Sequence, residues 1–174
     1  TPRNEDVGDH QVEINASDGL VTVTQDFLIT VINTNDSPIF TSNPLTSIDE
    51  DTLYSYSITS NDPDGDEVSY AAVRIPAWLS FNSSTGLLTG TPTNDNVGEH
   101  DVTIRASDGT FNTDQSFTVT VNNTNDPPAF TSTAVTTVDE DSLYSYTVLA
   151  SDIDGDNITY SASTLPTWLT FDPS

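Results

Sequence analysis

Short runs of acidic residues with a fixed spacing are the part of this sequence that could do chemistry. Three aspartates alternate with other residues in DPDGD, from Asp62 to Asp66, and a near copy, DIDGD, runs from Asp152 to Asp156. Two like charges about 4 Å apart repel by roughly 4 kcal/mol at an effective dielectric constant near 20. Such a cluster therefore needs a compensating positive charge, and a bound metal cation would supply one.

Calcium is the cation that best suits acids placed in loops. It takes about six to eight oxygen ligands at about 2.3–2.6 Å in irregular geometry, whereas magnesium keeps more of its waters. The acids lie where strands are expected to end, in DED (Asp49–Asp51), DPDGD, ASDG (Asp108) and NTND (Asn123–Asp126). An EF-hand does not fit, because a loop counted from Asp62 has Val73 where that motif needs a glutamate. The alternative is an acidic, solvated surface, but such a surface would scatter its acids.

The overall charge excludes several classes of partner. The 174 residues contain 27 acidic side chains against three basic ones, Arg3, Arg74 and Arg105, and the formal net charge is −24. Nucleic acid and anionic membrane surfaces attract Lys and Arg, so neither is an expected partner. The absence of Cys excludes disulfides and thiolate metal sites. No apolar run approaches the roughly 20 residues that a membrane-spanning helix needs, so membrane insertion is not expected.

The elements that must position these acids repeat along the chain. TPRNEDVGDH at Thr1 returns as TPTNDNVGEH at Thr91, and NTNDSP at Asn33 returns as NTNDPP at Asn123, so equivalent residues differ by 90 in number. The Pro- and Asn-rich NTND segments mark the joints between repeats. Residues 1–37 are then the C-terminal part of a preceding repeat, 38–127 a complete repeat, and 128–174 the N-terminal part of a following repeat.

Within the complete repeat, apolar residues alternate with polar ones, which predicts strands with one buried face. The alternating sets are Tyr54, Tyr56 and Ile58; Val68, Tyr70 and Ala72; Val102, Ile104 and Ala106; and Phe117, Val119 and Val121. NSSTG (Asn82–Gly86) predicts a tight turn. About seven short strands per repeat predict an all-β chain of tandem Ig-like antiparallel β-sandwiches. The first piece should hold the last two strands of a sandwich, and the last piece its first four or so.

The order of the motifs resembles bacterial cadherin-like repeats, of the dystroglycan-type cadherin-like and "putative Ig" families. The residues that carry the resemblance are DPDGDEVSY, IPAWLSFNSSTGLLTGTPTNDNVG, ASDG and the linker NTNDPP. The resemblance implies that calcium binds at each joint through ligands from both neighbouring repeats. The implied ligands at the first joint are Asp6, Asn33, Asn35, Asp36, Asp62, Asp64, Asp66 and Asp108. At the second joint they are Glu50, Asp95, Asn123, Asn125, Asp126, Asp152, Asp154 and Asp156. NDNVG stands where cadherins carry an acidic Asp-Arg-Glu motif, which implies one to three ions per joint.

Two other residue types have weaker functional interpretations. Trp78 and Trp168 lie in IPAWLSF and LPTWLTF, where we expect them to pack in the sandwich rather than stack on sugars. His10 and His100 occupy equivalent strand positions, which favours a structural role. No arrangement of a nucleophile with a base, and no isolated carboxylate pair, indicates an enzyme.

These patterns predict a calcium-binding structural or adhesive repeat of a stalk or filament, in a secreted or cell-surface protein. Other copies or adjacent repeats are the expected head-to-tail partners, because the two end pieces together lack only the equivalents of Thr85–Gly90 from one sandwich. The alternative is a carbohydrate-binding module for a polysaccharide, which an exposed aromatic strip would favour and a buried Trp78 would disfavour.

Overall fold

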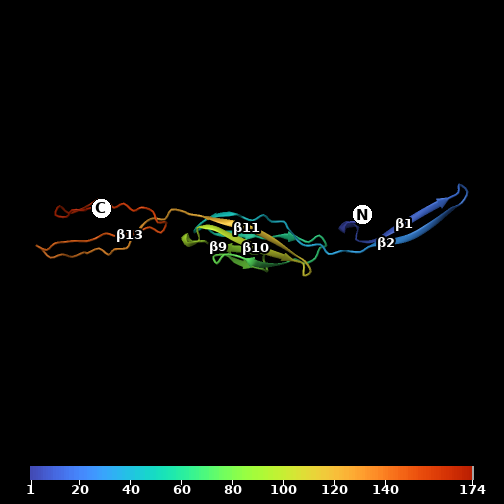
Figure 1. Cartoon of the computed structure of the whole chain (residues 1–174), viewed down its shortest axis with the longest axis horizontal. Helices are drawn as coiled ribbons and strands as arrows, with labels where there is room; N and C mark the ends of the chain where they lie inside the picture. The colour runs from blue at the N-terminus through green and yellow to red at the C-terminus, as the bar shows by residue number, and fades with distance from the viewer. Residues whose placement is uncertain (174) are drawn as a thin grey trace.

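The structure is a computed structural model that describes residues 1–173, and the chain is extended. Figure 1 shows three parts in a row, with a hairpin at one end, a sandwich in the middle and a third segment at the other end. The hairpin follows a short 3-10 helix, η1 (Asn4–Asp6), and pairs β1 (Gly8–Ser17) with β2 (Thr22–Val31) in antiparallel register. No helix within residues 1–173 has the length and apolar character needed to cross a membrane.

The sandwich in the middle consists of nine strands and one 3-10 helix. They are β3 (Ile39–Phe40), β4 (Ser47–Asp49), β5 (Tyr54–Ser57), β6 (Ser60–Asn61), β7 (Ser69–Arg74), β8 (Ser80–Asn82), β9 (Leu87–Gly90), η2 (Asn94–Asn96), β10 (Gly98–Ser107) and β11 (Asn112–Asn122). One sheet has the order β4-β11-β10-β7, a second has the order β5-β9-β8, and β3 pairs with β6. The all-β fold predicted from the alternating pattern is confirmed.

The core lies between the two sheets. Tyr54, Ile104 and Val119 are completely buried, and every second residue of β5, β10 and the end of β11 follows them into the interior. The prediction that Ala72, on β7, faces the core is wrong, because Ala72 is exposed. β7 is an edge strand of its sheet, so its side chains are covered less completely than those of the central strand β10.

The predicted turn at NSSTG is also present. The Asn82 side-chain oxygen accepts hydrogen bonds from the backbone N–H groups of Ser84 and Thr85, at 3.0 and 3.2 Å. Gly86 ends the turn with a φ of 66°, a conformation that glycine adopts without steric cost.

The third segment has fewer strands than the sequence predicts. It forms only β12 (Ala129–Phe130) and β13 (Ala150–Ser151), which pair as β3 and β6 do in the sandwich. In the sandwich, β4 and β7 pair with β11 and β10, while β5 and β8 pair with β9. The equivalents of those three partner strands are absent from residues 128–173, so the remaining extended residues have no ladder to join.

Candidate calcium centres at the joints

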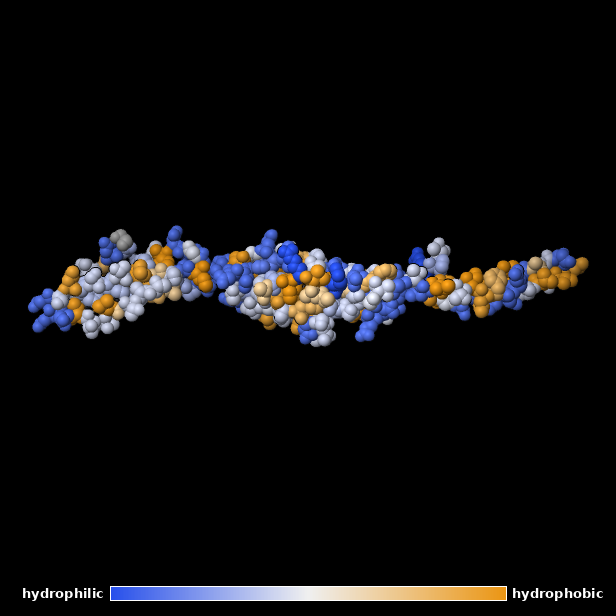
Figure 2. All heavy atoms as spheres, turned by 60° about the horizontal axis from the view of Figure 1, so that its bottom comes forward, coloured by the Kyte–Doolittle hydropathy of each residue, from blue (hydrophilic) through white to orange (hydrophobic). Residues whose placement is uncertain are grey.

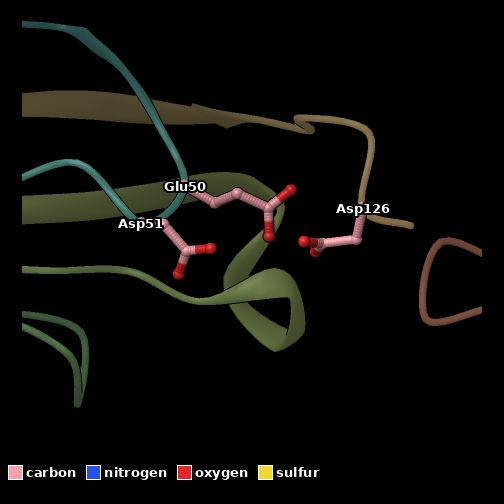
Figure 3. A group of neighbouring side chains, drawn as sticks. All are labelled: Glu50, Asp51 and Asp126. Atoms are coloured by element: carbon pink, nitrogen blue, oxygen red, sulfur yellow. The ribbon is translucent and has the colours of Figure 1, made fainter. Parts of the chain in front are cut away.

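The second joint brings three carboxylates together beside the sandwich. Carboxylate oxygens of Glu50, Asp51 and Asp126 all lie within 4.8 Å of one another. Glu50 and Asp51 follow β4 directly, and Asp126 belongs to the linker after β11. Figure 3 shows the three side chains pointing toward a common point from these two segments. The arrangement concentrates negative charge in a space of the size that one cation fills.

Glu50 is the most informative residue of this cluster, because its side chain is only 2% exposed. Its Oε1 accepts a hydrogen bond of 2.7 Å from the Thr124 backbone N–H. Its Oε2 is buried and has no hydrogen-bond partner. A buried charged oxygen without a partner is costly, so this atom is a candidate ligand for a cation.

Asp51 lies in the cluster through an unusual backbone conformation. Its φ is 57°, in the left-handed region that non-glycine residues seldom adopt. The Asp51 N–H donates to the Pro92 carbonyl at 2.8 Å, which holds the turn in place. Asp141, the equivalent residue of the third segment, has a φ of 61°. The sequence identifies Asp51 as a strand-end acid but not as a ligand, because backbone handedness leaves no signal in the pattern of residue types.

The downstream segment meets the same joint through Asp154. One Asp154 carboxylate oxygen accepts a 2.6 Å hydrogen bond from the Asp126 N–H, and the other accepts a 2.7 Å bond from the Asn94 side chain. Asn94 also donates to Asn123 at 3.4 Å. Its neighbour Asp95, the residue expected from the sequence, is exposed on η2. The sequence pattern does not identify Asn94, because a carboxylate stands next to it and a neutral amide is the weaker candidate of the two.

The remaining expected residues of this joint surround a hollow of about 260 Å³. Asn125, Asp126, Asp152 and Asp156 line it, so both repeats contribute oxygen atoms. Asp152 Oδ1 accepts the N–H groups of Asp154 and Asp156, at 3.0 and 3.3 Å. The DIDGD turn therefore folds around its first aspartate, while the Asp154 carboxylate reaches the linker and η2.

The first joint repeats this geometry with the DPDGD turn. Asp62 is 5% exposed, and its Oδ1 accepts the N–H groups of Asp64 and Asp66, at 2.9 and 3.3 Å. Asp64 Oδ2 accepts the Asp36 N–H at 2.6 Å. Asp62 Oδ2 and Asp64 Oδ1 are buried without a hydrogen-bond partner. Both joints thus contain carboxylate oxygens that protein donors leave unsatisfied.

Asp108 and Asn35 also connect the two repeats at the first joint. The Asn35 side chain donates to Asp108 Oδ2 at 2.8 Å. The backbone N–H of Phe111, followed by Asn35, holds the pKa of Asp108 below its ordinary value of 3.8. The carboxylate therefore stays charged to a lower pH than an ordinary aspartate.

Asp6 and Asn33 are the other two residues expected as ligands at the first joint. Asp6 Oδ2 accepts a 2.9 Å hydrogen bond from the Arg3 N–H and so caps η1. Asn33 is exposed in the linker. The equivalent of Asp6 is Asn96, which caps η2 in the same way through the Thr93 N–H at 2.9 Å. A ligand role for Asp6 and Asn33 stays a prediction.

Two of the three arginines pair with carboxylates away from the joints. Arg74 pairs with Asp101 at 2.8 Å and Arg105 pairs with Asp114 at 2.7 Å, on the four-stranded sheet. The donors at the joints are backbone N–H groups and amides, which bind only some of the carboxylate oxygens. An oxygen-only set with unsatisfied, partly buried carboxylates fits a hard cation such as calcium.

Comparisons with known proteins bear on the fold. Residues 37–122 and 127–174 match the family described as "Putative Ig domain". A search of curated proteins finds no match. The mouse protocadherin-24 EC1-3 structure is similar at a TM-score of 0.50, with 21% identity over 95% of this chain and 64% of that chain. This likeness shows the fold alone, a cadherin-like β-sandwich.

Two further structures are similar over shorter stretches. An endo-fucoidan hydrolase of glycoside hydrolase family 107 has 26% identity and a TM-score of 0.47, over 71% of this chain and 20% of that chain. Human protocadherin-24 EC1-2 has 25% identity and a TM-score of 0.46, over 68% of this chain and 61% of that chain. The chain thus spans a fifth of the hydrolase.

Proposed function

The chain belongs to the Putative Ig domain family, and from that premise we propose that it is a calcium-binding structural or adhesive segment of a tandem array. Its repeats are joined by linkers that carry carboxylates facing the next repeat. In this proposal calcium holds consecutive sandwiches at a fixed angle and stiffens a stalk or filament. The role is mechanical rather than catalytic.

The observation that carries the proposal is the buried, unpartnered Oε2 of Glu50 beside Asp51 and Asp126. A pair of charges 4.8 Å apart would repel by about 3.5 kcal/mol at an effective dielectric constant of about 20, and by about 1 kcal/mol or less where solvent screens an exposed member such as Asp51. Without a cation, this repulsion acts directly between the sandwich and its linker. Binding of a divalent cation removes the repulsion and satisfies the oxygen at the same time.

In this proposal, both sides of each joint supply ligands to the ion. Glu50, Asp51 and Asp126 would hold the ion from the upstream side of the second joint, with Asp152, Asp154 and Asp156 on the downstream side. Asp62, Asp64, Asp36, Asn35 and Asp108 would do the same at the first joint. When bound, calcium supplies the positive charge that lets these carboxylates approach one another. The backbone N–H of Asp126 and the side chain of Asn94 position Asp154 for this contact.

An extracellular location is part of the proposal. Extracellular calcium modules commonly bind with a Kd of about 10⁻⁴–10⁻³ M, which suits sites whose ligands come from two separate repeats. We therefore place the array in a secreted or cell-surface protein. The chain's strongly acidic surface is compatible with a solvated, extended stalk.

The carbohydrate-binding alternative has less support. Trp78 is half-buried and packs edge-to-face against Tyr54 and His100, with ring centroids 5.9 and 5.7 Å apart. An indole held in this way is not a free platform for a sugar ring. The structural role expected for His100 agrees with this packing, because its Nε2 lies 2.6 Å from the Asn96 carbonyl oxygen.

Calorimetric titration of the chelator-treated chain with calcium tests the proposal. Binding to the folded state alone stabilises it by about 2.7 kcal/mol when calcium exceeds Kd a hundredfold, so melting should shift to higher temperature. Magnesium at the same concentration should give a smaller shift. Glu50→Gln, which keeps the size of the side chain, should weaken calcium binding. An unchanged melting curve and no heat of binding would refute the proposal.

A further inference from the structure

A neutral amide joins the sandwich to the downstream segment at the second joint. The Asn94 side chain donates to Asp154 Oδ1 at 2.7 Å, and the Asp126 backbone N–H donates to Asp154 Oδ2 at 2.6 Å. Hydrogen bonds to a carboxylate are shorter and stronger than those between neutral groups. Both oxygens of Asp154 therefore have protein donors from the upstream side of the joint, and this contact needs no cation.

The turn that carries Asp154 has the same shape as its counterpart in the complete repeat. The DIDGD turn closes on Asp152 as the DPDGD turn closes on Asp62. At each joint the last aspartate of the linker donates its backbone N–H to the middle aspartate of the turn at 2.6 Å. The position of Asp154 is therefore set by the turn and the linker.

Asn94 lies on η2, a helix of three residues that needs support from the sandwich. A single turn orders more backbone than its few hydrogen bonds stabilise, so it is weak by itself. Pro92, just before η2, is fully buried, and its carbonyl oxygen accepts the Asp51 N–H at 2.8 Å. Pro92 thus fixes the start of η2 to the sandwich.

His100 fixes the other end of η2. Its Nε2 lies 2.6 Å from the Asn96 carbonyl oxygen, and an imidazole that carries a proton on Nε2 donates to this oxygen. The ring of His100 packs edge-to-face with Trp78 at 5.7 Å between centroids, and Trp78 packs with the completely buried Tyr54 at 5.9 Å. Three rings therefore connect the core to η2. His10 makes the same 2.6 Å contact with η1.

The charge of the joint explains why an amide suits position 94. Figure 2 shows hydrophilic side chains gathered where the sandwich meets the downstream segment. Glu50, Asp51 and Asp126 already place three carboxylates at this joint. Asn94 donates to Asp154 without adding negative charge, whereas a carboxylate at the same position would repel Asp154.

We propose that Asn94, positioned by His100, fixes the direction of the downstream repeat without a metal ion. The second joint then keeps its alignment when calcium is removed, and calcium stiffens an alignment that the protein already has. His100 acts through η2 and is a positioning residue. The proposal concerns the metal-free chain, so it goes beyond the calcium proposal and does not rest on it.

Distances between two spin labels test this proposal. The sequence contains no Cys, so Ser55→Cys on β5 and Thr131→Cys beside β12 give two unique labelling sites at exposed residues. Double electron–electron resonance in chelator should show one narrow distance distribution for the labelled parent. Asn94→Ala should replace this narrow distribution with a broad one. Asn4→Ala is the matched control at the first joint, where Asn4 donates to Asp36, and should leave the distribution unchanged.

Single and double variants test the role of His100. His100→Phe keeps a ring beside Trp78 but loses the donor to Asn96, so it should broaden the distribution as Asn94→Ala does. The two changes together should broaden it no further, because His100 acts through Asn94. His100→Gln, which can return a side-chain N–H, should restore part of the narrow distribution. Additive broadening in the double variant would overturn the positioning role.

Two results would overturn the proposal as a whole. One is a parent distribution that is broad in chelator and narrows only with calcium, and the other is a narrow distribution that Asn94→Ala retains. Asn94→Asp distinguishes this proposal from the calcium proposal. Its distribution should broaden in chelator through repulsion of Asp154, which supports the amide contact, and calcium should narrow it again. A distribution that stays broad in calcium would count against the calcium proposal alone.

Discussion

Replacing Asp51 with glycine should stabilise the metal-free protein. Asp51 has a φ of 57°, and a left-handed non-glycine residue costs about 1–3 kcal/mol, toward the lower end for aspartate. The change also removes one carboxylate from the cluster with Glu50 and Asp126; because Asp51 is exposed, solvent reduces that repulsion to about 1 kcal/mol or less. Glycine costs about 0.4–1 kcal/mol through the entropy of the unfolded chain. The net gain should be about 1 kcal/mol, which corresponds to a rise in Tm of about 4–8 °C for a domain of this size.

The same change should have the opposite effect on stabilisation by calcium. If the loss of one carboxylate ligand raises Kd tenfold, the free energy of binding falls by about 1.4 kcal/mol. At a calcium concentration about a hundred times the parent's Kd, the gain in stability then falls from about 2.7 to about 1.4 kcal/mol. Differential scanning calorimetry with calcium and with chelator measures both effects on one sample.

Two variants separate the backbone contribution from the charge. Asp51→Asn keeps tolerance for the left-handed conformation but removes the charge, so it should lose up to about half of the calcium response, as Asp51→Gly does, without the full gain in metal-free stability. Asp141→Gly makes the same backbone change at a φ of 61°, away from the Glu50 cluster, and should leave the calcium response unchanged. The reasoning fails if Asp51→Gly lowers the metal-free Tm and retains the parent's calcium response.

Three other changes probe the joints and the core. Asp126→Ala should be placed in a longer chain whose flanking repeats are complete. Small-angle X-ray scattering in calcium should then show a shorter, more bent particle, while the circular dichroism spectrum stays that of the parent. Equal lengths for variant and parent would count against calcium bridging the two repeats. The folded-state pKa of Asp108 is lowered, so its contribution to stability is present above about pH 4 and is lost as the pH falls through that lower pKa. Asp108→Asn should therefore lose less stability on acidification than the parent. Identical acid-unfolding curves would contradict the lowered pKa of Asp108. Ile104→Ala should lower the free energy of unfolding in urea by about 2–5 kcal/mol, whereas Ile14→Ala, at the equivalent exposed position, should lower it far less. Similar losses of stability for the two variants would contradict the exposure of Ile14.

The fold could be predicted from the sequence because its determinants are local and repeated. Alternation at Tyr54, Tyr56 and Ile58 reports a buried face directly, and the recurrence of NTND marks where one sandwich gives way to the next. Strand formation in residues 128–173 could not be predicted in the same way. A strand needs a ladder partner as well as a pattern, and the partners of most of this segment lie outside it.

Residue type indicates candidate ligands, but it does not indicate residues whose position depends on backbone geometry. Acidic runs identified Glu50, Asp126 and Asp154, all of which the structure places at the second joint. Asp51 reaches the cluster through a left-handed turn, and Asn94 reaches Asp154 because η2 turns its side chain toward the linker. Neither the sign of φ nor the direction of a 3-10 helix follows from the identity of a residue.

The parallel pairing of β4 with β11 determines how a pulled array would resist force. Ser47, Ile48 and Asp49 oppose Thr120, Val121 and Asn122, and these two strands lie near the start and the end of the repeat. Tension along the chain draws two parallel strands past each other, so their hydrogen bonds are loaded in shear and must break together. The short β3–β6 pairing yields first, since it joins only two residue pairs. Each sandwich would then resist extension through the β4–β11 pair. Glu50 and the linker lie at the end of this pair.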